Sequence, residues 1–159
     1  MRSGNLVKHK MERTADGKQF SNTPWGRKGE MHMLKPENYM KIQEVLLNYI
    51  NGTYESDIPL LKSCFHENAK MTGYLGDTLV DGTPEPFFED MASGPSMALR
   101  KDPYQAEIQS IHITGRTASA AVHETGFRGN TCLTDYFHLL MMEDGSWKIV
   151  SKTFTTTEQ

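Results

Sequence analysis

The amino-acid sequence predicts an α+β domain in which helices come first and an antiparallel sheet follows. Three segments between residues 36 and 94 carry the apolar spacing of amphipathic helices, with one short hairpin among them. From residue 104 onward, four long strand-like segments are joined by tight turns. Short connections between neighbouring strands indicate an antiparallel meander, and helices followed by such a sheet are typical of α+β proteins.

Residues 1–33 differ from the rest of the chain. They are rich in Lys, Arg, Gly, Ser and Asn and follow neither a helical nor a strand period. We therefore expect a disordered or loosely docked arm, in which Phe20 and Trp25 could still provide an anchor. Met31 and Met33 also allow the natural chain to start there, with upstream or artificially added sequence before it. The domain itself is expected over residues 34–157.

The helical half begins at Pro36, which suits the first turn of a helix, and Gly52 is expected to end this helix. Asp57 is expected to cap a second, shorter helix. A hairpin around Gly76 follows, and a third helix is expected to be capped by Thr83. The apolar residues expected to face inward from these helices are Ile42, Val45, Leu46, Tyr49, Ile50, Leu61, Cys64, Phe65, Phe87, Phe88 and Met91.

The sheet half contains four predicted strands, over residues 104–113, 116–127, 131–142 and 146–156. If each strand pairs directly across its turn, His123 and Thr153 both lie opposite Asp135. The face that carries Asp135 is otherwise apolar enough for the helices to cover it, and Glu124 and Lys152 fall on the other face. A shift of one residue at the last turn would instead place Lys152 beside Asp135.

Asp135 is the first candidate catalytic residue, because a carboxylate on an apolar face is costly to bury without a partner. The imidazole of His123 could donate an N–H to it, and the two residues have the composition of a general acid–base dyad. The alternative is structural. In that case, Asp135 and His123 only satisfy each other's hydrogen bonds, or Asp135 holds a backbone turn.

Four short motifs carry a resemblance to a known family. They are Phe65-His66, Thr134-Asp135-Tyr136, Gly145 followed by Trp147 to Ile149, and Ser151-Lys152. Over residues 34–154 the chain resembles the nuclear-transport-factor-2-like superfamily, and within it the branch of the putative lumazine-binding and polyketide-cyclase-like proteins. This resemblance implies three helices packed on a strongly curved sheet, which forms a cone with a pocket at its mouth. It also implies a homodimer through the outer sheet face, and enzymes that use Asp, His and Tyr without a metal.

The remaining candidates are ligand-binding side chains of this cone. Tyr74 could donate its phenol to a ligand oxygen, although packing alone also explains it. His66 could point into the mouth, or cap a helix C-terminus as a cation. Lys152 is an ion-pair partner of Asp135 or of Glu124, or else a solvated strand residue. The ligand-binding candidates together are Tyr54, His66, Tyr74, Phe137 and Lys152.

Several classes of function are disfavoured. A net charge of −3 without a basic stripe argues against nucleic-acid binding. No apolar segment approaches the ~20 residues of a membrane helix, and no signal peptide is visible, so we expect a cytoplasmic protein. Cys64, Cys132 and the 6 histidines match no metal-binding spacing, and we expect neither a metal nor a cofactor.

The favoured function is the binding of a small apolar or aromatic molecule in the cone, with cofactor-free acid–base isomerisation or dehydration as the reaction. The alternative is a non-catalytic ligand-binding or dimeric interaction module, so the sequence leaves open whether the protein is an enzyme. A cone filled by Phe87, Phe88 and Phe137 would favour the alternative.

Overall fold

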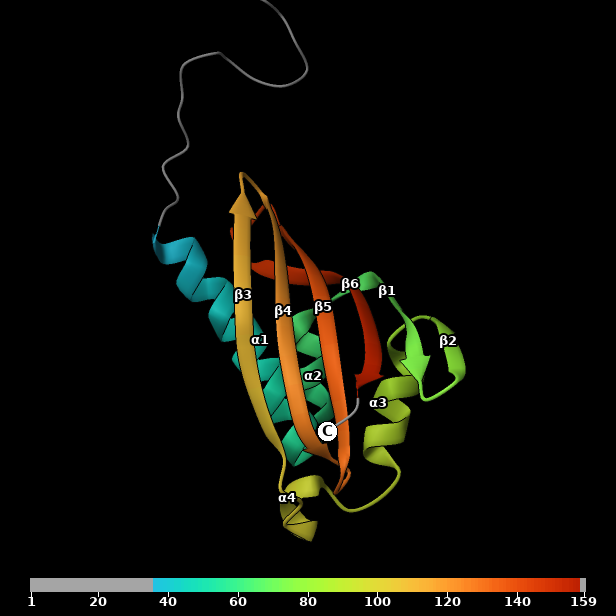
Figure 1. Ribbon diagram of the computed structural model, residues 1–159. Coiled ribbons are helices and arrows are strands. Elements are labelled where there is room, and N and C mark those ends of the chain that lie inside the picture. Colours follow the sequence, from blue (N-terminus) through green and yellow to red (C-terminus); the bar gives the residue numbers. More distant parts are fainter. Residues whose placement is uncertain (1–35, 158–159) are drawn as a thin grey trace, which may run out of the picture. The chain divides into compact units, whose positions relative to one another are not determined.

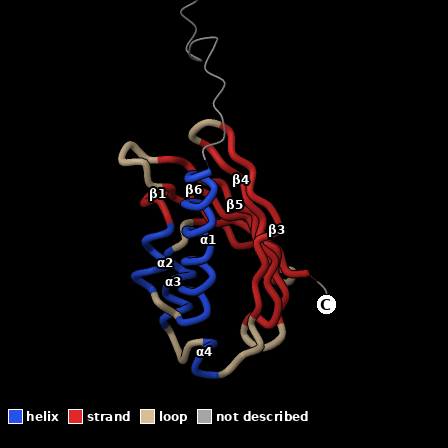
Figure 2. Tube along the Cα trace, turned by 90° about the vertical axis from the view of Figure 1, so that its left-hand side faces the viewer, coloured by secondary structure: helices blue, strands red, loops and turns tan. Residues whose placement is uncertain are grey.

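Helices cover one face of a curved sheet, which confirms the α+β class (Figures 1 and 2). The computed structural model describes residues 36–157, and the arm expected over residues 1–33 lies outside them. The described helices are α1 (Pro36–Glu55), α2 (Ile58–Cys64), α3 (Glu85–Ala92) and α4 (Met97–Arg100). The described strands are β1 (Phe65–Leu75), β2 (Thr78–Gly82), β3 (Gln105–Thr114), β4 (Thr117–Phe127), β5 (Thr131–Met141) and β6 (Trp147–Thr157).

Gly52 lies where α1 packs against α2, rather than at the end of α1 as predicted. The prediction that α1 ends at Gly52 is wrong, because α1 continues to Glu55 and Gly52 is buried. A Cβ at Gly52 would lie 2.9 Å from Cγ of Leu61, so the glycine permits close packing of α1 on α2. The predicted cap of α2 is confirmed, since Oδ1 of Asp57 accepts the backbone N–H of Leu60 at 3.0 Å.

The helix α3 begins without the predicted cap. Pro84 takes the N-cap position in place of Thr83, and no side chain accepts a hydrogen bond from the first turn. The inward side of α3 carries Phe88 and Met91, both buried, as predicted. The short helix α4 lies in a segment that was expected to be a loop, and Oγ of Ser96 caps it.

The strands follow the order β2-β1-β6-β5-β4-β3. The predicted meander from β3 to β6 and the hairpin of β1 with β2 are both present, and their pairs are antiparallel. The two parts join because β1 runs parallel to β6. The pairs β3–β4, β4–β5 and β5–β6 each contain a β-bulge, which is typical of sheets that bend strongly.

The bulge in β4 decides which side chains face the helices. Phe127 pairs with Thr131 as predicted, but Glu124 then pairs with Leu133, so β4 has one extra residue in between. Gly126 lies there with a φ of +66°, and a Cβ on it would stand 2.3 Å from the carbonyl oxygen of Pro103. This left-handed glycine is what a bulge of this type requires.

The consequence is that the predicted pairing of His123 with Asp135 is wrong. Val122 pairs with Asp135, and His123 pairs with Thr134. An extra residue reverses the alternation of a strand, so His123 lies on the outer face and Glu124 lies inside. Glu124 is 1% exposed.

A second bulge acts in the same way on β6. His138 pairs with Ser151 and Leu139 pairs with Ile149, which leaves Val150 as the extra residue. Phe154, rather than Thr153, therefore pairs with Asp135. Lys152 turns inward as a result and forms an ion pair with Asp135. The expected shift at the last turn is absent, because Met141 still pairs with Trp147 there, and the shift lies at this bulge instead.

The core fills the space between the helices and the sheet. Its largest buried side chains come from α1, α2, β5 and β6, and they are Ile42, Leu46, Tyr49, Leu61, Phe137, Leu139 and Ile149. None of the helices in the described part of the chain is long and apolar enough to cross a membrane.

Candidate functional site

Five polar side chains meet inside this core, and we call them the buried polar cluster: Tyr49, Tyr104, Glu124, Asp135 and Lys152. Tyr49 comes from α1, Tyr104 immediately precedes β3, and the other three come from β4, β5 and β6. Asp135 is 0%, Glu124 1% and Lys152 3% exposed. Ionisable side chains are rarely buried to this degree unless they are paired.

An ion pair forms the centre of the cluster. Nζ of Lys152 lies 2.7 Å from Oδ2 of Asp135. The phenol of Tyr49 donates to the same oxygen at 2.8 Å, and Lys152 donates in turn to the phenol oxygen. The ammonium group also lies 4.9–5.2 Å from the ring centres of Tyr49, Phe87 and Phe154, which stabilises a desolvated cation.

Glu124 brings a second carboxyl group to this ion pair. Burial raises the pKa of Glu124 well above its ordinary value, and the negative charge of Asp135 raises it further, while Lys152 opposes both effects. Neutral Glu124 together with the Lys152–Asp135 ion pair gives a cluster without net charge.

Several polar atoms of the cluster have no hydrogen-bond partner within the described part of the chain. They are both carboxyl oxygens of Glu124, Oδ1 of Asp135 and the phenol oxygen of Tyr104. Burial, followed by the charges of Glu124 and Asp135, raises the pKa of Tyr104, so its phenol stays protonated. Buried polar atoms without partners are uncommon in folded proteins, and they are typical of sites that hold a ligand or water.

Aromatic rings surround the cluster. The ring of Tyr49 lies 5.0 Å from that of Phe137, 6.1 Å from that of Phe65 and 6.2 Å from that of Phe87. Phe137 is almost fully buried, whereas Phe87 is only half-buried. The interior beside the cluster is therefore apolar and closely packed, and Phe87 is the ring that reaches the surface.

Two of the predicted site residues belong to this cluster. Asp135 and Lys152 form its ion pair, and the predicted Phe137 packs against Tyr49 beside them. The predicted partner of Asp135, His123, does not reach it. Nδ1 of His123 lies 3.2 Å from Oγ1 of Thr134 on the outer face.

The other predicted ligand-binding residues lie outside the cluster. Tyr74 is 51% exposed on β1. Nδ1 of His66, on β1, accepts the backbone N–H of Asn68 at 3.1 Å. Tyr54 stacks on Tyr104, with ring centres 5.8 Å apart, and therefore borders the cluster.

Sequence reasoning missed Tyr49 and Glu124 as site residues, and it considered Tyr104 only as a weaker phenol candidate. Tyr49 was assigned to the apolar stripe of α1, which is correct for its ring and leaves its phenol unexplained. Glu124 was placed outside because the bulge was not anticipated. The signal that could have found it is Gly126, since an isolated glycine within a strand pattern indicates a bulge.

Comparisons with known proteins agree with this fold. The model of the family described as putative lumazine-binding matches residues 37–155. A solved NTF2-like protein of unknown function from Shewanella baltica OS155 is 28% identical, covers 80% of this chain and 100% of its own, and has a TM-score of 0.69. A second one, from Methylobacillus flagellatus KT, is also 28% identical, covers 79% and 96%, and has a TM-score of 0.69.

A more distant structure shares the fold alone. It is a ketosteroid isomerase-like protein from Erwinia carotovora atroseptica SCRI1043, with 15% identity, coverage of 79% and 100%, and a TM-score of 0.57. No curated protein matches the chain. The family match covers most of the chain and the solved structures share its architecture, so the chain belongs to the putative lumazine-binding family of the nuclear-transport-factor-2-like superfamily.

Proposed function

We propose that this domain binds a small neutral, apolar or aromatic molecule in its cone and catalyses a cofactor-free acid–base reaction on it. The observation that carries the proposal is the burial of Glu124, Asp135 and Lys152, each 3% exposed or less, at one point of an aromatic interior. Apolar residues of similar size would stabilise the fold at least as well as a buried ion pair. Clusters of buried groups with perturbed pKa values are typical of functional sites.

The geometry suggests a role for each group. Oδ2 of Asp135 is held by Tyr49 and Lys152, while its Oδ1 is free to accept a proton from the ligand. Protonated Glu124 and the phenol of Tyr104 can donate hydrogen bonds to a ligand oxygen, which stabilises the charge that develops there. A proton taken from one carbon by Asp135 and returned to another gives an isomerisation.

The charge of the cluster supports a neutral ligand. The Lys152–Asp135 ion pair and a neutral Glu124 leave no net charge inside the cone, so a charged ligand would bury an uncompensated charge. The family description and the ketosteroid isomerase-like fold relative are both compatible with a small ring-containing ligand.

Deuterium exchange tests this proposal. Neutral bicyclic ketones, such as β-tetralone and indanone, have exchangeable protons next to a carbonyl group, and NMR in D₂O follows their loss. We expect the wild-type protein to accelerate this exchange and Asp135→Asn to abolish the acceleration. His123→Gln, on the outer face, is the matched control and should retain it. Binding of these ketones without any acceleration would refute catalysis.

The close packing of the cone favours a second candidate function. Phe87, Phe137 and Tyr49 occupy the interior beside the cluster, which is the arrangement expected of a non-catalytic ligand-binding or dimeric interaction module. Under this alternative, ketones would bind without proton exchange, or would not bind.

For either function we propose a homodimer through the outer sheet face. Tyr136 is 54% exposed and Leu140 39% exposed there, next to His138 and the small residues of β4. Exposed aromatic and aliphatic side chains beside polar ones are typical of an interface.

A further inference from the structure

The helix α3 separates the buried polar cluster from solvent on one side. It carries Phe87, whose ring centre lies 5.2 Å from Nζ of Lys152 and 6.2 Å from the ring centre of Tyr49. The same ring also packs against the small apolar group formed by Met71, Leu133 and Phe154. Phe87 is half-buried, so this one side chain contacts both the cluster and the surface.

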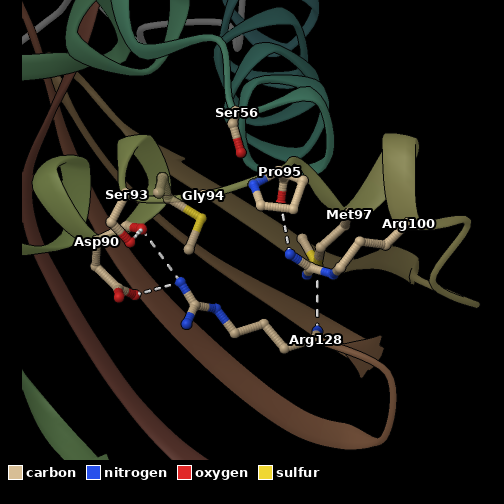
Figure 3. A pocket seen from close by; sticks show the side chains of 9 residues that line it. Ser56, Asp90, Ser93, Gly94, Pro95, Met97, Arg100 and Arg128 are labelled. Atoms are coloured by element: carbon tan, nitrogen blue, oxygen red, sulfur yellow. Dashed lines mark hydrogen bonds and ion pairs between the residues drawn. The ribbon is translucent and has the colours of Figure 1, made fainter.

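Each end of α3 is fastened by an ion pair at the surface. At its start, Glu85 lies 2.6 Å from Lys62 of α2, with side chains 54% and 48% exposed. At its end, Asp90 lies 2.7 Å from Arg128 of the turn between β4 and β5, with side chains 53% and 42% exposed. Figure 3 shows Arg128 reaching across to Asp90. Exposed ion pairs add little net stability and are screened by salt.

A pocket borders each end of α3. A pocket of about 260 Å³ lies at its start and is lined by Lys62, His66 and Glu85 among others. A smaller pocket of about 80 Å³ lies at its end and is lined by Asp90 and Arg128 among others (Figure 3). Each ion pair therefore borders a pocket, and the buried side chains of α3 are Phe88 and Met91.

We propose that α3 is a lid over the buried polar cluster, and that the Lys62–Glu85 and Asp90–Arg128 ion pairs shift it modestly toward the closed position. Opening swings Phe87 away from Lys152 and admits solvent and small molecules to the cluster. The purpose of the lid rests on the proposed function, because a cluster that binds nothing needs no entrance. The motion itself can be measured without any ligand.

Chemical labelling of Lys152 measures opening directly. Under native conditions, formaldehyde with cyanoborohydride methylates only lysines that it can reach, and peptide mass spectrometry gives the rate at each site. Lys70, exposed on β1, reports the activity of the reagent. We expect Glu85→Gln and Asp90→Asn each to accelerate methylation of Lys152 by about threefold, the factor that corresponds to one exposed ion pair. Glu89→Gln, which removes an exposed carboxylate from the same helix, is the matched control.

Salt provides a second measurement that needs no variant. In about 1 M sodium chloride, where the screening length is about 3 Å, methylation of Lys152 in the wild-type protein should accelerate similarly. Amide hydrogen exchange in β5 serves as the reference for global unfolding and should change less than the labelling of Lys152. The proposal would be overturned if the methylation rate of Lys152 stayed unchanged in salt and in a variant that combines Glu85→Gln with Asp90→Asn. An equal acceleration of amide exchange in β5 would also overturn it, because it would indicate global unfolding.

The outcomes keep the lid and the proposed function apart. If Lys152 becomes accessible as expected but neutral ketones neither bind nor exchange, the lid stands and the function fails. If ketones exchange but labelling of Lys152 does not respond to either ion pair, the function stands and the lid fails.

Discussion

The pH dependence of stability tests whether Glu124 is protonated in the folded protein. Its pKa is raised well above the ordinary value of 4.5 because the side chain is buried beside Asp135. At pH values between the pKa of Glu124 in the unfolded chain and its higher pKa in the folded protein, folding therefore takes up one proton. Ionised Glu124 favours the unfolded chain. The stability that depends on this proton is fully present below about pH 4.5 and is lost as the pH rises through the folded-state pKa.

Glu124→Gln removes this titration and keeps the shape of the side chain. Each pH unit inside the window corresponds to about 1.4 kcal/mol for one proton. From about pH 5 to about pH 7, the free energy of unfolding of the variant should therefore rise relative to that of the wild type, by up to about 1.4 kcal/mol per pH unit for as long as the pH lies below the folded-state pKa of Glu124. The other ionisable groups are present in both proteins, so their contributions cancel in the difference.

Urea unfolding at several pH values gives the measurement, with Glu89→Gln as the control for loss of one exposed carboxylate. A difference between Glu124→Gln and wild type that stays constant over this range would mean that Glu124 does not take up a proton on folding. The neutral cluster, and with it the preference for a neutral ligand, would then be wrong.

Three further predictions concern the ion pair, the bulge and the outer face. Lys152→Met should destabilise the protein by about 3–5 kcal/mol, because it leaves a buried carboxylate unpaired, and adding Asp135→Asn should restore part of the loss in urea unfolding. Gly126→Ala should cost about 1–3 kcal/mol more than Gly115→Ala. Both glycines have positive φ, but only at Gly126 would the new Cβ meet a carbonyl oxygen, at 2.3 Å. Equal losses of unfolding free energy in the two variants would contradict the close approach at the bulge. Tyr136→Glu should convert a dimer to a monomer in sedimentation at micromolar concentration, and a monomeric wild type would contradict the proposed interface.

The sequence predicted the elements far better than the faces of the strands. The turns and the cap by Asp57 are local features, and local chemistry specifies them. Which side a strand residue faces depends on every residue between it and the turn. One extra residue in β4 was enough to misplace Glu124, and one extra residue in β6 was enough to misplace Lys152. Asp135 was placed correctly because no bulge lies between it and the Thr131 turn on its own strand.

The alternation of side chains along a strand cannot predict the partners of Asp135. Tyr49 is 86 residues away in the chain, and its hydrogen bond to Asp135 depends on how α1 packs across the sheet. The sequence did identify the right carboxylate, since its polarity on an apolar face was visible without the fold. The inward side of α3 was visible in its apolar spacing, whereas its ion pairs could not be predicted, because they depend on where the helix lies relative to Lys62 and Arg128.

The bulges also change how relatives of this chain should be aligned. Val150 is the extra residue of its strand, so a relative that lacks it would still direct Lys152 inward, along a straighter strand. A one-residue gap at Val150 leaves the inward direction of Lys152 unchanged. The same gap between Ser151 and Phe154 would instead exchange inward-facing and outward-facing side chains. Length variation among family members is therefore informative only when its position is known relative to the bulge. A pairwise comparison that places the gap three residues too late would match Lys152 with a residue of the opposite face.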